Sequence, residues 1–256
     1  MVASRGGLAI LASMGRLTGE RRAIAAALLV FYAFLYLLVA LAPPPGWAAA
    51  FSAMALVYGA GFFGLVAGYF WARWYAIGLG MSGLITAVFS VIQIGMEPVL
   101  LFYGATHAGV SLFLWGGGMS SAFDGRKEWR ERFHLDENST HKLGKSVIRL
   151  GISLPYIVLY ALAPKDGAGE AIFAMLAGGL VLAGIVALFR LRTWGVAALA
   201  GGVVALAASL VTGAFGLAPF GNGYALNMTA AGAAGMLLVI AALAPFLRPV
   251  TRYLRA

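Results

Sequence analysis

The sequence predicts an all-α integral membrane protein, a bundle of about eight transmembrane helices with both termini in the cytoplasm and one amphipathic cytoplasmic loop between the fourth and fifth spans. Apolar residues make up 62% of the 256 residues and charged residues only 11%, against about 25% charged residues in soluble domains. All Lys and Arg residues except Lys165, 17 of the 18, fall on one side of the apolar segments if these alternate in direction. This bias marks the cytoplasmic side of a membrane protein.

Apolar runs in the first half of the chain are long enough for four spans, since a span needs about 20 residues. These spans are expected over residues 23–42, 47–71, 76–94 and 98–122. Arg73 marks the cytoplasmic turn between the second and third spans, and Pro98 opens the fourth. Residues 1–22 are expected to form a cytoplasmic N-terminal arm, so that residues 23–122 hold the first four spans.

The second half repeats this organisation after a polar segment. Residues 123–146 are expected to form the amphipathic cytoplasmic loop, residues 147–247 the last four spans, and residues 248–256 a basic cytoplasmic tail. The individual spans are expected over residues 147–163, 168–189, 194–217 and 224–247. Both halves start from the same side of the membrane, so a parallel repeat of four plus four spans remains an open alternative.

Small residues on the spans predict close helix packing, because helices in lipid associate through van der Waals contact of small faces. The candidate faces contain Gly64 with Gly68, Gly178 with Gly179 and Gly184, Gly201 with Gly202, and Ala231 with Gly235. We expect most of these faces to be internal, with contacts to other subunits as the alternative.

The fourth span carries the candidate for a substrate or proton path. His107 is expected near the midplane, where an ionisable side chain is rare and suggests function. Tyr103 and Ser111 are four residues away on either side and share its face of the helix. Glu97 and Gln93 lie near the outer end and are candidates for the entry. The alternative role for His107 is a hydrogen bond that joins neighbouring helices.

The cytoplasmic loop carries the candidate docking surface. Trp129 and Phe133 are expected on one side of a short helix on the membrane surface. Lys142, Lys145 and Arg149 then share one face of the helix that becomes the fifth span, which Asn138 or Ser139 is expected to cap. This basic face suits anionic lipid headgroups or a protein partner.

The composition excludes several kinds of chemistry. The chain has no Cys, so disulfides, thiolate nucleophiles and Cys-ligated metals are absent. His134 and His141 stand near acidic residues in the loop, but their spacing matches no tight metal site. A haem held between two helices usually needs two intramembrane histidine ligands, and His107 is the only histidine expected within a span. We therefore expect no metal, no cofactor and no catalytic residue, and we interpret the net charge of +9 as membrane orientation rather than nucleic-acid binding.

Two functions agree with these patterns. The first is a non-catalytic multi-pass subunit or scaffold of a larger membrane assembly, or of a homo-oligomer, rather than an enzyme. The alternative is a transporter or channel for a small solute or proton. An intramembrane enzyme acting on lipid ranks third, because acid–base pairs are missing. The abundance of Ala, Gly and Arg indicates a bacterial inner membrane.

Overall fold

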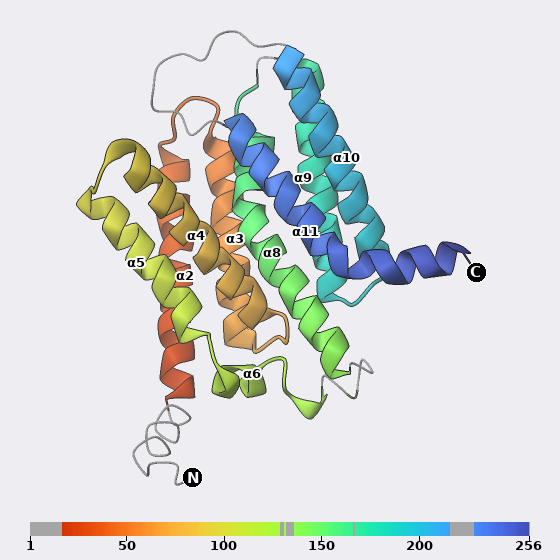
Figure 1. Ribbon diagram of the computed structural model, residues 1–256. Coiled ribbons are helices and arrows are strands. Elements are labelled where there is room, and N and C mark those ends of the chain that lie inside the picture. The colour runs from red at the N-terminus through yellow and green to blue at the C-terminus, as the bar shows by residue number, and fades with distance from the viewer. Residues whose placement is uncertain (1–16, 129–130, 132–135, 166, 216–227, 256) are drawn as a thin grey trace.

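The computed structural model describes residues 17–128, 131, 136–165, 167–215 and 228–255. Within these ranges the regular structure is helical, and seven helices are long and apolar enough to cross a membrane. They are α2 (Thr18–Leu41), α3 (Ala48–Ala67), α4 (Ala72–Ile94), α8 (Glu137–Leu162), α9 (Ala168–Phe189), α10 (Trp194–Phe215) and α11 (Met228–Arg255). Figure 1 shows these helices packed side by side as a bundle. The expectation of an all-α bundle of membrane-spanning helices is confirmed at this level.

The fourth predicted span is two helices rather than one. The structure has α5 (Pro98–Phe113) and the short α6 (Gly117–Ala122) where the sequence predicted one helix over residues 98–122. Gly116 separates them with a φ of 108°, a backbone conformation that glycine adopts without steric cost. The 16 residues of α5 extend about 24 Å at 1.5 Å per residue. This helix is shorter than the roughly 30 Å of hydrocarbon in a typical bilayer.

Helix α8 begins before the predicted fifth span. The Asp136 carboxylate accepts a hydrogen bond from the backbone N–H of Ser139 at 2.8 Å, so Asp136 caps α8 where the sequence suggested Asn138 or Ser139. Ser, Asn and Asp side chains can all cap a helix N-terminus. Here Asp136 does so, two residues before Asn138 and three before Ser139. Lys142 and Lys145 are therefore part of a continuous helix with the span.

Helix α11 extends past the predicted last span. Its helical backbone continues to Arg255, through most of the segment predicted as a tail over residues 248–256. Figure 1 shows its final part leaving the bundle at an angle. Pro245 and Pro249 lie in this part, and prolines are the commonest cause of such bends because each removes a backbone N–H.

Helix α8 is the centre of the bundle. In its most apolar window 67% of the residues are buried, against at most 39% in any other candidate span. It packs on α3 and α4 on one side and on α9 and α11 on the other. In the first half α2 pairs with α3 and α4 with α5, whereas in the second half α9 pairs with α10 and α8 with α11. This different pairing argues against the four-plus-four repeat.

A close helix crossing joins α4 to α8 through two glycines, Gly78 and Gly151. A Cβ atom on Gly78 would lie 2.5 Å from the carbonyl oxygen of Ile148 and 2.8 Å from the Cα of Gly151. A Cβ on Gly151 would lie 2.8 Å from the carbonyl oxygen of Tyr75. Backbone therefore meets backbone, and no side chain fits between the helices. Neither glycine belongs to the small-residue faces expected from the sequence.

The glycine faces selected from the sequence have mixed outcomes. Gly184 of α9 packs against Gly195 of α10, where a Cβ would lie 3.0 Å from the Gly195 carbonyl oxygen. Gly68 has another role: it ends α3 with a φ of 74°. Gly64 makes room for the ring of Trp71 and for Ala72, the first residue of α4.

The Gly78–Gly151 crossing gives a direct test. We expect Gly151→Ala to lower the free energy of unfolding by about 1–3 kcal/mol, since an added methyl group in a tight contact forces backbone shifts. The control is Gly59→Ala on α3, where a Cβ would have no neighbour within 4 Å, and where alanine favours the helix. The measurement is the thermal unfolding midpoint in detergent, followed by circular dichroism. Equal midpoints for the two variants would contradict the crossing.

Candidate functional site

His107 lies at the centre of a buried polar cluster formed by α2, α3 and α5. Its side chain is fully enclosed. Its Nε2 is 2.8 Å from the hydroxyl of Tyr58 on α3, and its Nδ1 is 2.8 Å from the carbonyl oxygen of Tyr103, one turn earlier on α5. Both ring nitrogens therefore have partners inside the protein.

These partners define the protonation state of the ring. A carbonyl oxygen only accepts, so Nδ1 carries the proton and donates it to Tyr103. In the neutral imidazole Nε2 is then an acceptor, and Tyr58 donates its hydroxyl proton to it. Since the ring is fully buried and neither partner is an acid, burial disfavours the charged imidazolium, and His107 is the neutral ring with its proton on Nδ1. Protonation of Nε2 would require the Tyr58 hydroxyl to turn and accept instead.

The aromatic surroundings leave the ring no free face. The ring centroids of Tyr32 and Tyr103 each lie 4.1 Å from that of His107. Gly83 of α4 closes another side, where any Cβ would overlap the imidazole. Tyr32 is held in turn by a hydrogen bond of 2.5 Å between its hydroxyl and that of Thr106. His107 is therefore packed in the core formed by α2, α3, α4 and α5.

The other residues of the predicted path are not gathered around His107. Glu97 and Gln93 are exposed at the turn between α4 and α5. The Ser111 hydroxyl donates to the carbonyl oxygen of Ile77 on α4 at 3.2 Å. Tyr103 is the predicted path residue that contacts the imidazole. Tyr32 and Thr106 are not among the site residues predicted from the sequence, although tyrosines inside apolar spans could have indicated a polar cluster.

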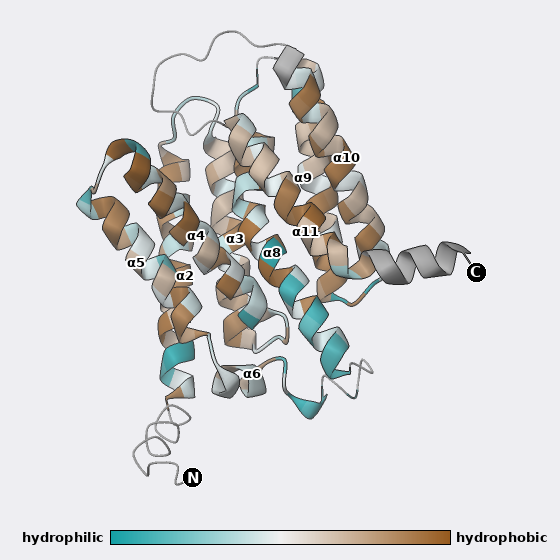
Figure 2. Ribbon diagram, viewed as in Figure 1, coloured by the Kyte–Doolittle hydropathy of each residue, from teal (hydrophilic) through white to brown (hydrophobic). Residues whose placement is uncertain are grey.

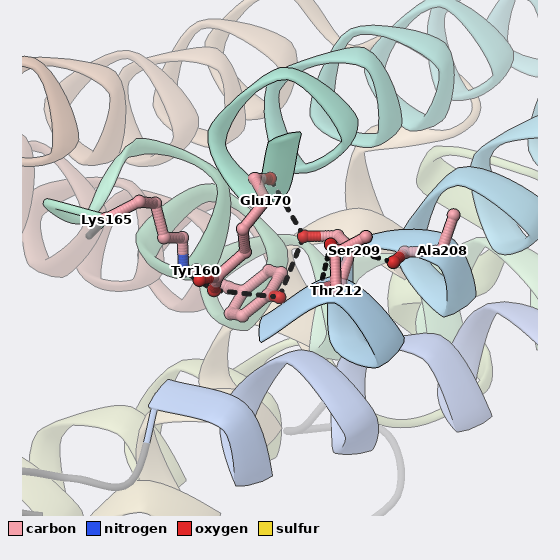
Figure 3. Close-up of polar contacts among 6 residues, drawn as sticks. All are labelled: Tyr160, Lys165, Glu170, Ala208, Ser209 and Thr212. Carbon is pink, nitrogen blue, oxygen red and sulfur yellow. Dashed lines mark hydrogen bonds and ion pairs between the residues drawn. The ribbon is translucent and has the colours of Figure 1, made fainter. Parts of the chain in front are cut away.

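A second polar cluster joins α8, α9 and α10 and is drawn in Figure 3. Lys165 Nζ lies 3.2 Å from Glu170 Oε1 and 3.6 Å from the centroid of the Tyr160 ring. The Tyr160 hydroxyl is 2.9 Å from Ser209 Oγ on α10, and Ser209 donates to the backbone carbonyl of Glu170 at 3.0 Å. The cluster connects the ends of three helices at one turn.

The environment of Lys165 is partly closed. Burial lowers the pKa of its amine, while the hydrogen bond and the negative charge of Glu170 act in the opposite direction. Lys165 was predicted only as the one basic residue of an external turn, so this cluster was not predicted from the sequence. The spacing in the sequence could have indicated this ion pair, because a lysine follows one span directly and a glutamate lies in the first turn of the next.

The predicted docking residues divide into two groups. Lys142 and Lys145 are exposed near the start of α8. Arg149 is half-buried and donates from Nη1 to the carbonyl oxygen of Ala241 on α11 at 2.6 Å, so it joins two helices of the bundle. Trp129 and Phe133 lie outside the described residues.

The clusters carry no recognisable metal chemistry. Within the described part of the chain, no group of three or more His, Asp or Glu side chains is arranged to hold a metal ion. Comparison of the chain with protein-family models, with curated proteins and with solved structures gave no match.

The hydrogen bond from Tyr58 to His107 predicts a measurable loss of stability. Tyr58→Phe leaves Nε2 of a fully buried imidazole without a donor, which costs about 1–3 kcal/mol for a buried polar group. Tyr69→Phe is the matched control, because Tyr69 is exposed. The thermal unfolding midpoint in detergent is the readout. A Tyr58→Phe protein as stable as the Tyr69→Phe protein would mean that the bond contributes nothing.

Proposed function

We propose that the chain is a non-catalytic multi-pass subunit or scaffold of a larger membrane protein assembly in a bacterial inner membrane, with both termini in the cytoplasm. The orientation rests on the distribution of charge. Figure 2 shows hydrophilic segments at the start of α2, after α6 and at the start of α8, all at one end of the bundle. Basic residues near short membrane turns favour the cytoplasmic side.

The observation that carries the structural role is the complete internal bonding of His107. An imidazole that relays protons or binds a solute needs a nitrogen that can be reached and a proton that can be exchanged. Here one nitrogen donates to a carbonyl, the other accepts from Tyr58, and the ring is fully enclosed. Such an arrangement fits a residue that joins helices within lipid.

The exposed residues of α8 supply the candidate contact for a partner. Lys142 and Lys145 are exposed at its cytoplasmic end, while the rest of α8 is largely buried. A partner that docks there would bind a rigid helix, because α8 is packed against four other helices. This surface is therefore held in a fixed position relative to the bundle.

This proposal is tested by native mass spectrometry after gentle detergent extraction from the native membrane. We expect a partner in fixed stoichiometry with the chain, lost when Lys142→Glu and Lys145→Glu are combined. The control is Arg192→Glu, which alters charge at another exposed turn. A clean monomer or homo-oligomer from the unmodified protein would overturn the larger assembly.

Transport of a proton or small solute is the second candidate, favoured by the convergence of hydroxyl groups. The ring centroid of Tyr36 on α2 lies 5.4 Å from that of Tyr58 on α3, and the Tyr58 hydroxyl is bonded to His107 Nε2 at 2.8 Å. This chain of polar groups links His107 towards the outer end of α2. A proton path along these groups would require their hydroxyls to form hydrogen bonds with one another as they turn.

Proton flux into liposomes separates the two candidates. If the chain of hydroxyls conducts, His107→Ala and Tyr58→Phe should each abolish a flux that the unmodified protein shows, and Tyr69→Phe should leave it intact. The measurement is the fluorescence of a pH dye trapped in the liposomes. Flux that survives both substitutions, or no flux from the unmodified protein, would exclude this path.

A further inference from the structure

Two arginines from distant segments meet at the inner end of α3. Arg22 belongs to the first turns of α2, and Arg126 follows α6. A Cβ atom on Gly68 would lie 3.6 Å from Arg22 Nη2 and 3.8 Å from both Nη1 and Nη2 of Arg126. Gly68 has a φ of 74°, so glycine suits the position and leaves this point open. Both guanidinium groups therefore converge on one small space.

The nearest carboxylate is already occupied. Asp124 Oδ1 accepts from Arg73 Nε at 2.6 Å, and its Oδ2 accepts from Arg73 Nη2 at 3.0 Å and from Ser120 Oγ at 2.9 Å. Arg22 donates to the carbonyl oxygen of Val66 at 2.6 Å. Among the described residues no carboxylate lies within ion-pair distance of Arg22 or Arg126. Two like charges are thus held together without a counter-charge.

Such a pair matches the chemistry of a phosphate group. Guanidinium groups form charge-assisted, often bidentate hydrogen bonds with phosphate oxygens, and arginine is favoured where planar recognition of phosphate matters. We propose that Arg22 and Arg126 together bind the phosphate of an anionic phospholipid at the inner membrane surface. A phosphate between them would supply the missing negative charge and accept from both side chains.

The neighbouring surface identifies a lipid rather than a soluble anion. The side chains of Val66 and Phe63, in the last turns of α3, are 54% and 59% exposed. The Val66 carbonyl accepts from Arg22, and Phe63 lies three residues earlier on the same face of α3, so the two side chains form an apolar strip beside Arg22. A phospholipid bound with its phosphate on the arginines can lay an acyl chain along this strip.

This site is separate from the general basic character of the inner face. Arg73 is neutralised by Asp124, and Arg21 donates to the carbonyl oxygens of Leu112 and Trp115. Lys142 and Lys145 are exposed singly on α8. The site does not depend on the function proposed above, since a subunit and a transporter would each have lipid neighbours.

The test uses the full-length protein in a neutral detergent, titrated with phosphatidylglycerol and examined by native mass spectrometry. Arg126→Gln is the informative variant, because Arg126 is exposed and its loss should leave the unfolding midpoint unchanged. Arg192→Gln removes the same charge from another exposed turn and is the control. We expect Arg126→Gln to weaken the tightest binding of phosphatidylglycerol about five-fold, the effect of one basic residue near an anionic membrane surface.

Each result of this titration either supports or overturns the lipid site. Weaker binding in Arg126→Gln alone, with phosphatidylcholine bound less tightly than phosphatidylglycerol, supports the site. If Arg192→Gln weakens the binding equally, the effect comes from overall charge and the proposed site is wrong. Unchanged binding in Arg126→Gln would also overturn the site. Displacement of the lipid by millimolar inorganic phosphate would also overturn it, because the arginines would then serve a soluble anion.

Discussion

Polar groups inside the hydrocarbon region of a membrane must be bonded within the protein, because lipid offers them neither donors nor acceptors. This requirement explains the arrangement of the interior. His107 is bonded through both ring nitrogens, Ser146 of α8 donates to the carbonyl oxygen of Ala242 on α11 at 2.8 Å, and Arg149 donates to the neighbouring carbonyl of Ala241. Each bond connects two helices or fixes a ring, so polar residues that are expensive in lipid also hold the bundle together.

The same constraint explains why α8 is the most polar of the central helices and also the most buried. Pro155 lacks an N–H and so leaves the carbonyl of Gly151 without its usual helical partner. At Gly151 the backbone of α4 approaches closely, since a Cβ there would lie 2.8 Å from the carbonyl oxygen of Tyr75. A helix with serines, an arginine and a proline can cross the hydrocarbon only where other helices surround it. The polar residues of α8 are therefore tolerated inside the membrane because α3, α4, α9 and α11 surround the helix.

The sequence predicted the spans well and the site poorly. Hydropathy and turn residues predicted residues 168–189 with the same bounds as α9, because one turn begins with proline and the other carries arginine. The break between α5 and α6 was missed, since Gly116 lies in a segment whose composition is as apolar as a span. The depth of His107 indicated burial, but depth does not reveal partners. Tyr58 is 49 residues away in the chain, and only packing brings it to the imidazole.

Charge at the helix ends connects orientation with packing. Helices α3 and α5 end at the end of the bundle where α2 begins, and their last carbonyls carry partial negative charge. Arg22 donates to the carbonyl of Val66 near the end of α3, and Arg21 to those of Leu112 and Trp115 at the end of α5. At the opposite side Lys165 follows the end of α8 and Glu170 opens α9, again with the signs that helix dipoles favour. Basic residues of the kind that orient a chain by the positive-inside rule therefore also satisfy carbonyl groups at the helix ends.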